Sequence, residues 1–199
     1  MPKPLLAARY RVVVRDAQDR IKYIEEAPSK SFILNFLYVW WLCFNLDSSD
    51  SVSVTSSSGT QTTMTTSQPM GWYNWVNGGA KPYSGIQVGS GTSAPSASSP
   101  YLESLITSGT GSGQLSYGSD SVTSPSISSN PATLKISKTF TNNSGGSVTV
   151  GEIGLAPQIR NDSSGLYQAA LMVHDVLSSA VSVPNGGTIT VTYTLQVNT

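Results

Sequence analysis

The sequence predicts a mainly β protein, an antiparallel β-sandwich of the jelly-roll or Ig-like kind with an N-terminal hairpin and one apolar helix. In Thr188–Val197, apolar residues alternate strictly with Thr and Gln, which places the apolar side chains on one face of a strand. A Pro-Asn-Gly-Gly turn at residues 184–187 precedes that strand. Only 11% of the 199 residues are charged and the formal net charge is zero. Such a composition suits a β-protein covered by neighbours better than a free soluble enzyme.

Two more strands are predicted on either side of an Asn- and Gly-rich turn at residues 142–146. Gly151 and Glu152 interrupt the second strand, because Ile153 continues its apolar pattern with the opposite parity. One extra residue at a glycine predicts a β-bulge. The other apolar residues that carry the strand period here are Leu134, Ile136, Phe140, Val148, Val150 and Leu155.

Residues 167–176 are apolar on both parities, which predicts a central strand covered on both faces. This segment holds the single histidine, His174, beside Asp175. Adjacent residues on a strand point to opposite faces, so these two side chains are not expected to form a catalytic pair. Cysteine occurs once and no Cys/His cluster is present, so we expect no catalytic site, no metal site and no cofactor.

The N-terminal region predicts a small hairpin, with Tyr10, Val12 and Val14 alternating with arginines before a turn at residues 16–19. Residues 1–30 carry more Lys and Arg than Asp and Glu. This basic arm could contact nucleic acid or an acidic partner, although a solvated face explains the charges more simply.

Residues 32–44 are apolar at every position except Asn35. We interpret them as a helix buried between subunits, with Phe32, Phe36, Trp40, Trp41 and Phe44 as the assembly interface. The alternatives are a lipid-contacting anchor, although 13 residues of helix span only about 20 Å of a hydrocarbon layer of about 30 Å, and a pair of aromatic-rich strands. A signal peptide is not expected, because no small-residue cleavage site follows. The sequence thus divides into an assembly arm, residues 1–47, and a β-sandwich domain, residues 48–199.

Two features in the middle of the chain are candidates for binding. Trp72, Tyr73 and Trp75 could form a sugar-stacking or partner surface, or could simply cap the core. Glycines at 85, 89 and 91 are interpreted as turn glycines, because no lysine completes a phosphate-binding loop.

Three segments taken together resemble a recurring module in structural proteins of tailed bacterial viruses and related prokaryotic viruses. They are GIQVGSGTSAPSASSPYLESLI (85–106), KTFTNNSGGSVTVGEIGL (138–155) and HDVLSSAVSVPNGGTITVTYTLQV (174–197). The module carries a VGxG…AP segment, a FTNxSGxxxTVxEIGL hairpin and an RDVL…V.VPxGxTLTVTYT ending in this order, and the resemblance covers about residues 85–199. His174 departs from the usual arginine at its position.

The resemblance implies a virion component that is assembled in the host cytoplasm and contacts copies of itself and other virion proteins. It does not specify capsid, decoration, turret or tail, nor the host or copy number. Two alternatives remain open. One is a receptor- or glycan-binding module of a viral fibre that uses Trp72, Tyr73 and Trp75. The other is a non-viral cell-surface filament subunit held at a membrane by residues 32–44.

Overall fold

The computed structural model describes residues 6–29, 32–33, 36–37, 51–56, 61–65, 84–126, 132–160 and 167–197. Within these ranges the chain is mainly β and its strands pair antiparallel, as predicted. The strands are β1 (Leu6–Arg15), β2 (Ile21–Pro28), β3 (Ser51–Thr55), β4 (Gln61–Thr65), β5 (Gly85–Gly89), β6 (Ser116–Ser126), β7 (Ala132–Thr141), β8 (Val148–Ala156), β9 (Gln158–Arg160), β10 (Tyr167–Ala169), β11 (Val173–Val183) and β12 (Thr188–Val197).

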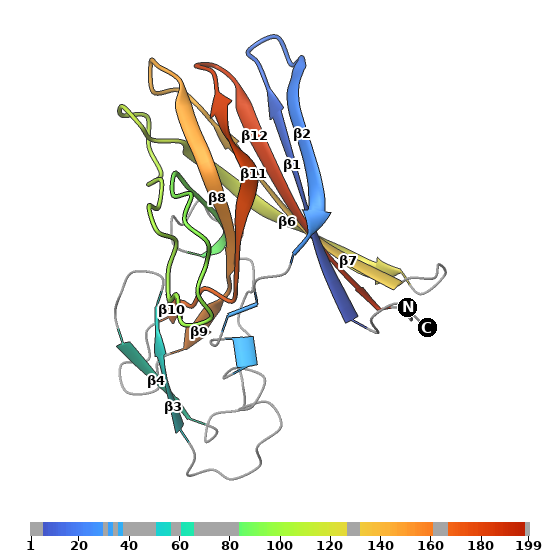
Figure 1. Ribbon diagram of the computed structural model, residues 1–199, viewed down its shortest axis with the longest axis vertical. Coiled ribbons are helices and arrows are strands. Elements are labelled where there is room, and N and C mark those ends of the chain that lie inside the picture. Colours follow the sequence, from blue (N-terminus) through green and yellow to red (C-terminus); the bar gives the residue numbers. More distant parts are fainter. Residues whose placement is uncertain are drawn as a thin grey trace.

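Two sheets form the body of the molecule (Figure 1). The five-stranded sheet has the order β2-β1-β12-β7-β6, and the three-stranded sheet has the order β11-β8-β5. The pairs β9–β10 and β3–β4 form two separate small sheets. The start of β1 lies beside the end of β12, since Leu6 pairs with Val197.

One hydrophobic core joins the two large sheets. It includes Tyr10, Phe140 and Tyr193 from the five-stranded sheet and Ile86 and Ile153 from the three-stranded sheet, none more than 5% exposed. Burial of such side chains from both sheets is the main force that holds them together. In the five-stranded sheet, side chains at alternate positions of β7 and β12 point either into this core or outward.

The predicted C-terminal strand is confirmed with the predicted bounds. Ile189, Val191 and Tyr193 are buried at 0%, 0% and 1% exposure, and the threonines between them are partly exposed. β12 lies between β1 and β7 and pairs with both along its length. β12 is therefore the central strand of the five-stranded sheet, and its apolar face lies in the core.

The turns at residues 142–146 and 184–187 reverse the chain as predicted, but each passes from one sheet to the other. β7 and β12 belong to the five-stranded sheet, whereas β8 and β11 belong to the three-stranded sheet. Buried Asn142 joins the two turns: its side-chain amide donates to the carbonyls of Gly146 and Val183, and its N–H donates to Gly187. The predicted hairpin around residues 142–146 is therefore a crossover between sheets.

The predicted irregularity at Gly151–Glu152 is present, but the extra residues lie on the partner strand. Val150 pairs with Val181 and Glu152 pairs with Val176, so β11 carries the longer stretch. Residues 167–176 do not form the expected central strand: they divide between β10 and β11, and β11 is the edge of its sheet. Residues 169–175 are nevertheless all buried, because the segment after β2 covers this edge, with Ile33 N–H donating to the carbonyl of Met172.

The apolar helix predicted over residues 32–44 is not seen in the described residues. Phe32 forms an antiparallel bridge with Val173, and only Phe36 and Leu37 have helical backbone. Pairing with the edge of β11 fixes the start of the segment in an extended conformation, which local apolar composition could not reveal.

The predicted N-terminal hairpin is confirmed as β1 and β2. β1 also pairs along its whole length with β12, so the hairpin is an integral part of the five-stranded sheet. The division of the chain at residue 47 remains a prediction.

Candidate functional site

The residues predicted as an assembly interface are described only in part. Phe32 and Phe36 are half-buried against the main core, and their ring centroids are 4.6 Å apart. Trp40, Trp41 and Phe44 lie outside the described residues, as do all three residues of the predicted ligand surface, Trp72, Tyr73 and Trp75.

His174 and Asp175 are buried and point away from each other. His174 Nε2 lies 2.7 Å from Glu152 Oε2, on the side of the loop that follows β5. Asp175 Oδ2 accepts hydrogen bonds from the hydroxyls of Ser29 at 2.7 Å and Tyr193 at 3.3 Å. The alternation of the strand thus places the two side chains in different hydrogen-bond networks, as the sequence predicted.

Glu152 holds the loop between β5 and β6 against β8. Its side chain has no exposed surface and accepts backbone N–H groups from Gly91 (3.1 Å), Glu103 (2.9 Å) and Ser104 (2.7 Å). Burial alone would raise the pKa of this carboxyl, but the bond to His174 and the backbone donors outweigh burial and lower it. A carboxylate with these donors is a structural anchor.

The glycines of the VGSG segment make room for that anchor. A Cβ on Gly89 would lie 2.3 Å from Glu152 Oε1, and one on Gly91 would lie 2.6 Å from it. The interpretation of these two residues as turn glycines is therefore incomplete. Glycine is also required at both positions because the Glu152 carboxylate leaves no room for a Cβ atom.

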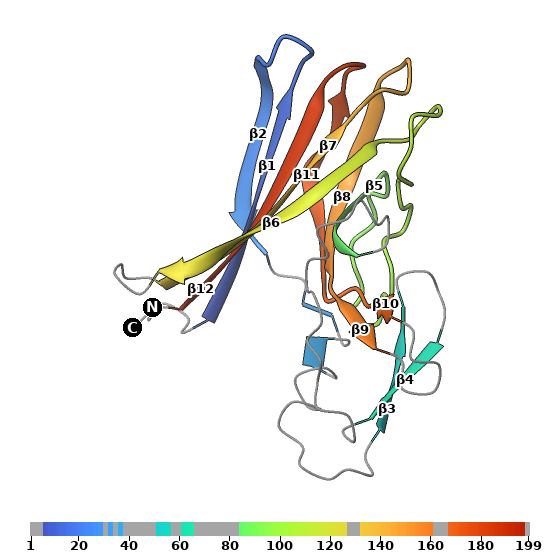
Figure 2. The ribbon, with the colours of Figure 1, turned by 180° about the vertical axis from the view of Figure 1, so that it is seen from behind.

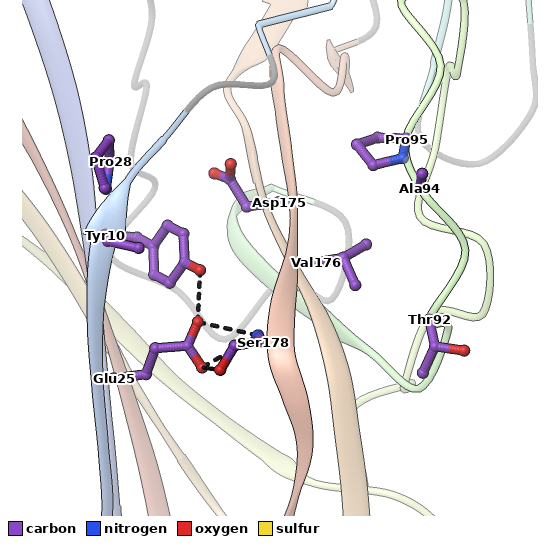
Figure 3. A pocket seen from close by; sticks show the side chains of 10 residues that line it. Tyr10, Glu25, Pro28, Thr92, Ala94, Pro95, Asp175, Val176 and Ser178 are labelled. Atoms are coloured by element: carbon purple, nitrogen blue, oxygen red, sulfur yellow. Dashed lines mark hydrogen bonds between the residues drawn. The ribbon is translucent and has the colours of Figure 1, made fainter.

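A pocket of about 450 Å³ opens where the edges of the two sheets approach each other (Figure 3). Glu25 of β2 reaches across it: Oε1 accepts Tyr10 OH at 2.7 Å and Ser178 N–H at 3.0 Å, and Oε2 accepts Ser178 Oγ at 2.9 Å and the hydroxyl of Tyr23. The remaining lining residues are Ala27, Pro28, Thr92, Ala94, Pro95, Asp175 and Val176.

The electrostatics of this pocket favour a structural role. Burial would raise the pKa of Glu25, but the hydroxyls of Tyr10 and Tyr23 and the Ser178 donors lower it. Burial, and then the bond to Glu25, raise the pKa of Tyr10. Glu25 is thus an ionised acceptor with four donors, and Tyr10 is a neutral donor. This pair joins β1 and β2 to β11 and offers neither an activated nucleophile nor a base aimed at open space.

The described residues contain no group of three or more His, Cys, Asp or Glu side chains that could hold a metal ion. In the same part of the chain, no helix is long and apolar enough to cross a membrane.

The inner face of the five-stranded sheet continues past the edge of the smaller sheet. In both views of the ribbon, the ends of β1, β12, β7 and β6 near the termini extend away from β8 and β11 (Figures 1 and 2). Val197 is 43% exposed near the end of β12, and Leu134 and Leu195 are half-buried beside it. Val122, which lies opposite Ile136 on the edge strand β6, is 50% exposed. We call these four residues the projecting face. They lie on the core-facing side of their strands, yet the smaller sheet does not cover them. An apolar surface is therefore partly exposed to solvent.

Comparisons with models of protein families, with curated proteins and with solved structures found no match for this chain.

Proposed function

We propose that this chain is a virion structural protein that acts by assembly with copies of itself and with other virion proteins, and that its two large sheets are an antiparallel β-sandwich of the jelly-roll or Ig-like kind. The ordered motifs in residues 85–106, 138–155 and 174–197 support the virion class through their resemblance to phage structural modules. The low charge of the chain, 11%, supports a surface covered by neighbours.

The projecting face is the observation that carries the proposal. Val122, Leu134, Leu195 and Val197 stand on hydrogen-bonded strands of the five-stranded sheet, so covering them orders little additional backbone. Complete burial of a large apolar side chain stabilises by roughly 1.5–3 kcal/mol. The face carries no charge of its own, so a second copy can lie against it without leaving a buried charge unpaired.

Sedimentation velocity at micromolar concentration without detergent tests the proposal. We expect the unaltered protein to sediment as an oligomer and the double variant Val122→Asp/Val197→Asp to sediment as a folded monomer. Ile24→Asp is the matched control, since Ile24 is 49% exposed but pairs with Val13 on the outward parity of the same sheet. It should leave the oligomer intact.

Two results would contradict the proposal. One is a monodisperse monomer for the unaltered protein; the other is an equal loss of assembly in the test and control variants. Electron micrographs of the purified assembly then distinguish a closed shell or tail from a filament.

A further inference from the structure

On the outer face of the five-stranded sheet, two cations of β1 lie near a third from β7, more than 100 residues away in the sequence. Arg9 and Arg11 stand on β1 at positions opposite in parity to the buried Tyr10 and Val12, and Lys135 stands on β7. Arg9 pairs with Thr194 of β12, and Thr194 pairs in turn with Lys135. Antiparallel pairing thus places the basic N-terminal residues and Lys135 on either side of one threonine-bearing strand.

These residues line a shallow hollow of about 490 Å³ on that face. Its surface combines cations with hydroxyl and amide groups from β12, β7 and β6: the polar uncharged residues are Thr123, Ser137, Thr192, Thr194 and Gln196. Its single carboxylate, Glu26, lies 3.2 Å from Arg9. Within the described part of the chain, Arg11 and Lys135 form no ion pair.

The small number of cations and the many hydroxyl groups in the hollow indicate which class of ligand it can bind. Proteins that hold DNA by its phosphates use about 6–10 such contacts, whereas this hollow offers three cations, of which Arg9 is already paired. Its one aromatic residue, Tyr10, is 5% exposed and cannot stack on a base. A sugar acid instead presents one carboxylate among many hydroxyls, which matches Arg11 and Lys135, two cations in no ion pair with another described residue, beside a surface of hydrogen-bonding side chains.

We propose that this hollow binds an acidic glycan, with a sugar carboxylate held by Arg11 and Lys135 and sugar hydroxyls held by Thr192, Thr194 and their neighbours. Arginine suits the role because its planar guanidinium binds a carboxylate through two parallel hydrogen bonds. Glu26 forms an exposed ion pair with Arg9 and can accept from a sugar hydroxyl. The hollow and the projecting face lie on opposite faces of the same sheet and share no side chain, so each can be altered without changing the other.

Calorimetric titration with polygalacturonate oligosaccharides, a chain of uronic acids, tests the proposal. We expect measurable binding that weakens roughly tenfold or more in Arg11→Ala/Lys135→Ala, as loss of charge-assisted bonds requires. Arg20→Ala/Lys22→Ala is the control of equal charge change: these two cations pair with Asp16 at the turn of the hairpin. It should bind as the unaltered protein does. Neutral dextran should not bind, and duplex DNA should bind more weakly than the uronate chain.

Each other outcome overturns the proposal. If the unaltered protein does not bind uronate, the hollow is not a glycan site. If both double variants bind uronate equally weakly, the binding reflects overall charge and not this hollow. Tighter binding of duplex DNA reassigns the face to nucleic acid. Circular dichroism of each variant establishes that the sheet is intact before titration.

Discussion

Lys138 and Asp120 face each other across β7 and β6 with Lys138 Nζ 2.7 Å from Asp120 Oδ2, and neither side chain has any exposed surface. Lys138 Nζ also donates to the carbonyl of Ser84 at 3.0 Å, and the N–H of Ile86 donates to Asp120 Oδ1 at 3.0 Å. Burial lowers the pKa of the lysine and raises that of the aspartate, and the ion pair opposes both shifts. The pair therefore joins the edge of the five-stranded sheet to β5 of the other sheet.

Removing one member of this pair should destabilise the fold strongly. Lys138→Met leaves the Asp120 carboxylate buried without its cation, at a cost of about 3–5 kcal/mol in the free energy of unfolding. Urea denaturation measures the loss. The double variant Lys138→Met/Asp120→Leu should recover most of it, because no charge then remains buried. Lys135→Met on the exposed face of the same strand is the control, with an expected change within about 0.5 kcal/mol. Equal effects of Lys138→Met and Lys135→Met would show that the pair contributes nothing.

The Glu152 anchor should make the loop over β8 sensitive to acid. The folded pKa of Glu152 lies below its ordinary value of 4.5, so its stabilising contribution is complete above that value and is lost as pH falls through the lowered pKa. Hydrogen exchange at the N–H groups of Gly91, Glu103 and Ser104, divided by the intrinsic amide exchange rate at each pH, should therefore increase on acidification. Glu152→Gln should accelerate it at neutral pH, at a cost of about 1–3 kcal/mol for the donors left unsatisfied.

Exchange at these amides that is unchanged in Glu152→Gln would contradict the assigned role of the carboxylate. The N–H of Asn142 in the crossover turn is the internal reference, since its acceptor is the carbonyl of Gly187 and no carboxylate takes part.

The parity of β12 predicts unequal effects at neighbouring positions. Tyr193 is 1% exposed in the main core, so Tyr193→Ala should reduce the free energy of unfolding by about 3–5 kcal/mol. Thr192 points to the opposite face and is partly exposed, so Thr192→Ala should cost far less. Thermal or urea unfolding of the two variants provides the comparison, and similar losses at both positions would refute the alternation.

His174 is expected to act structurally, and the protein is expected to have no enzymatic activity. His174→Ala removes the partner of buried Glu152, so it should lower stability and loosen the loop that Glu152 holds. Assays of the unaltered protein on peptidoglycan, polysaccharide and ester substrates should show no turnover. Turnover that disappears in His174→Ala while circular dichroism remains native would reverse this conclusion.

The partners of the buried polar residues were the hardest feature to predict from the sequence, although the positions of Lys138 and Glu152 gave a local signal. Lys138 has the same strand parity as the buried Ile136 and Phe140, and a lysine on a core face requires a buried anion. Glu152 stands at the predicted irregularity in β8, beside a glycine. Nothing in the local sequence named Asp120 or the amides of the loop as their partners, because these contacts join residues distant in the chain.

The sequence by itself determined the antiparallel β class, the N-terminal hairpin, the bounds of β12 and the divergence of His174 and Asp175. Each of these follows from a period of two or from turn residues, which are local properties of the chain. The tertiary structure decided which sheet each strand joins, the crossover at Asn142, the edge position of β11 and the extended start of residues 32–44. It also brought Arg9 and Arg11 beside Lys135. These features depend on pairing between distant strands, and the same alternation of apolar residues is compatible with many such pairings.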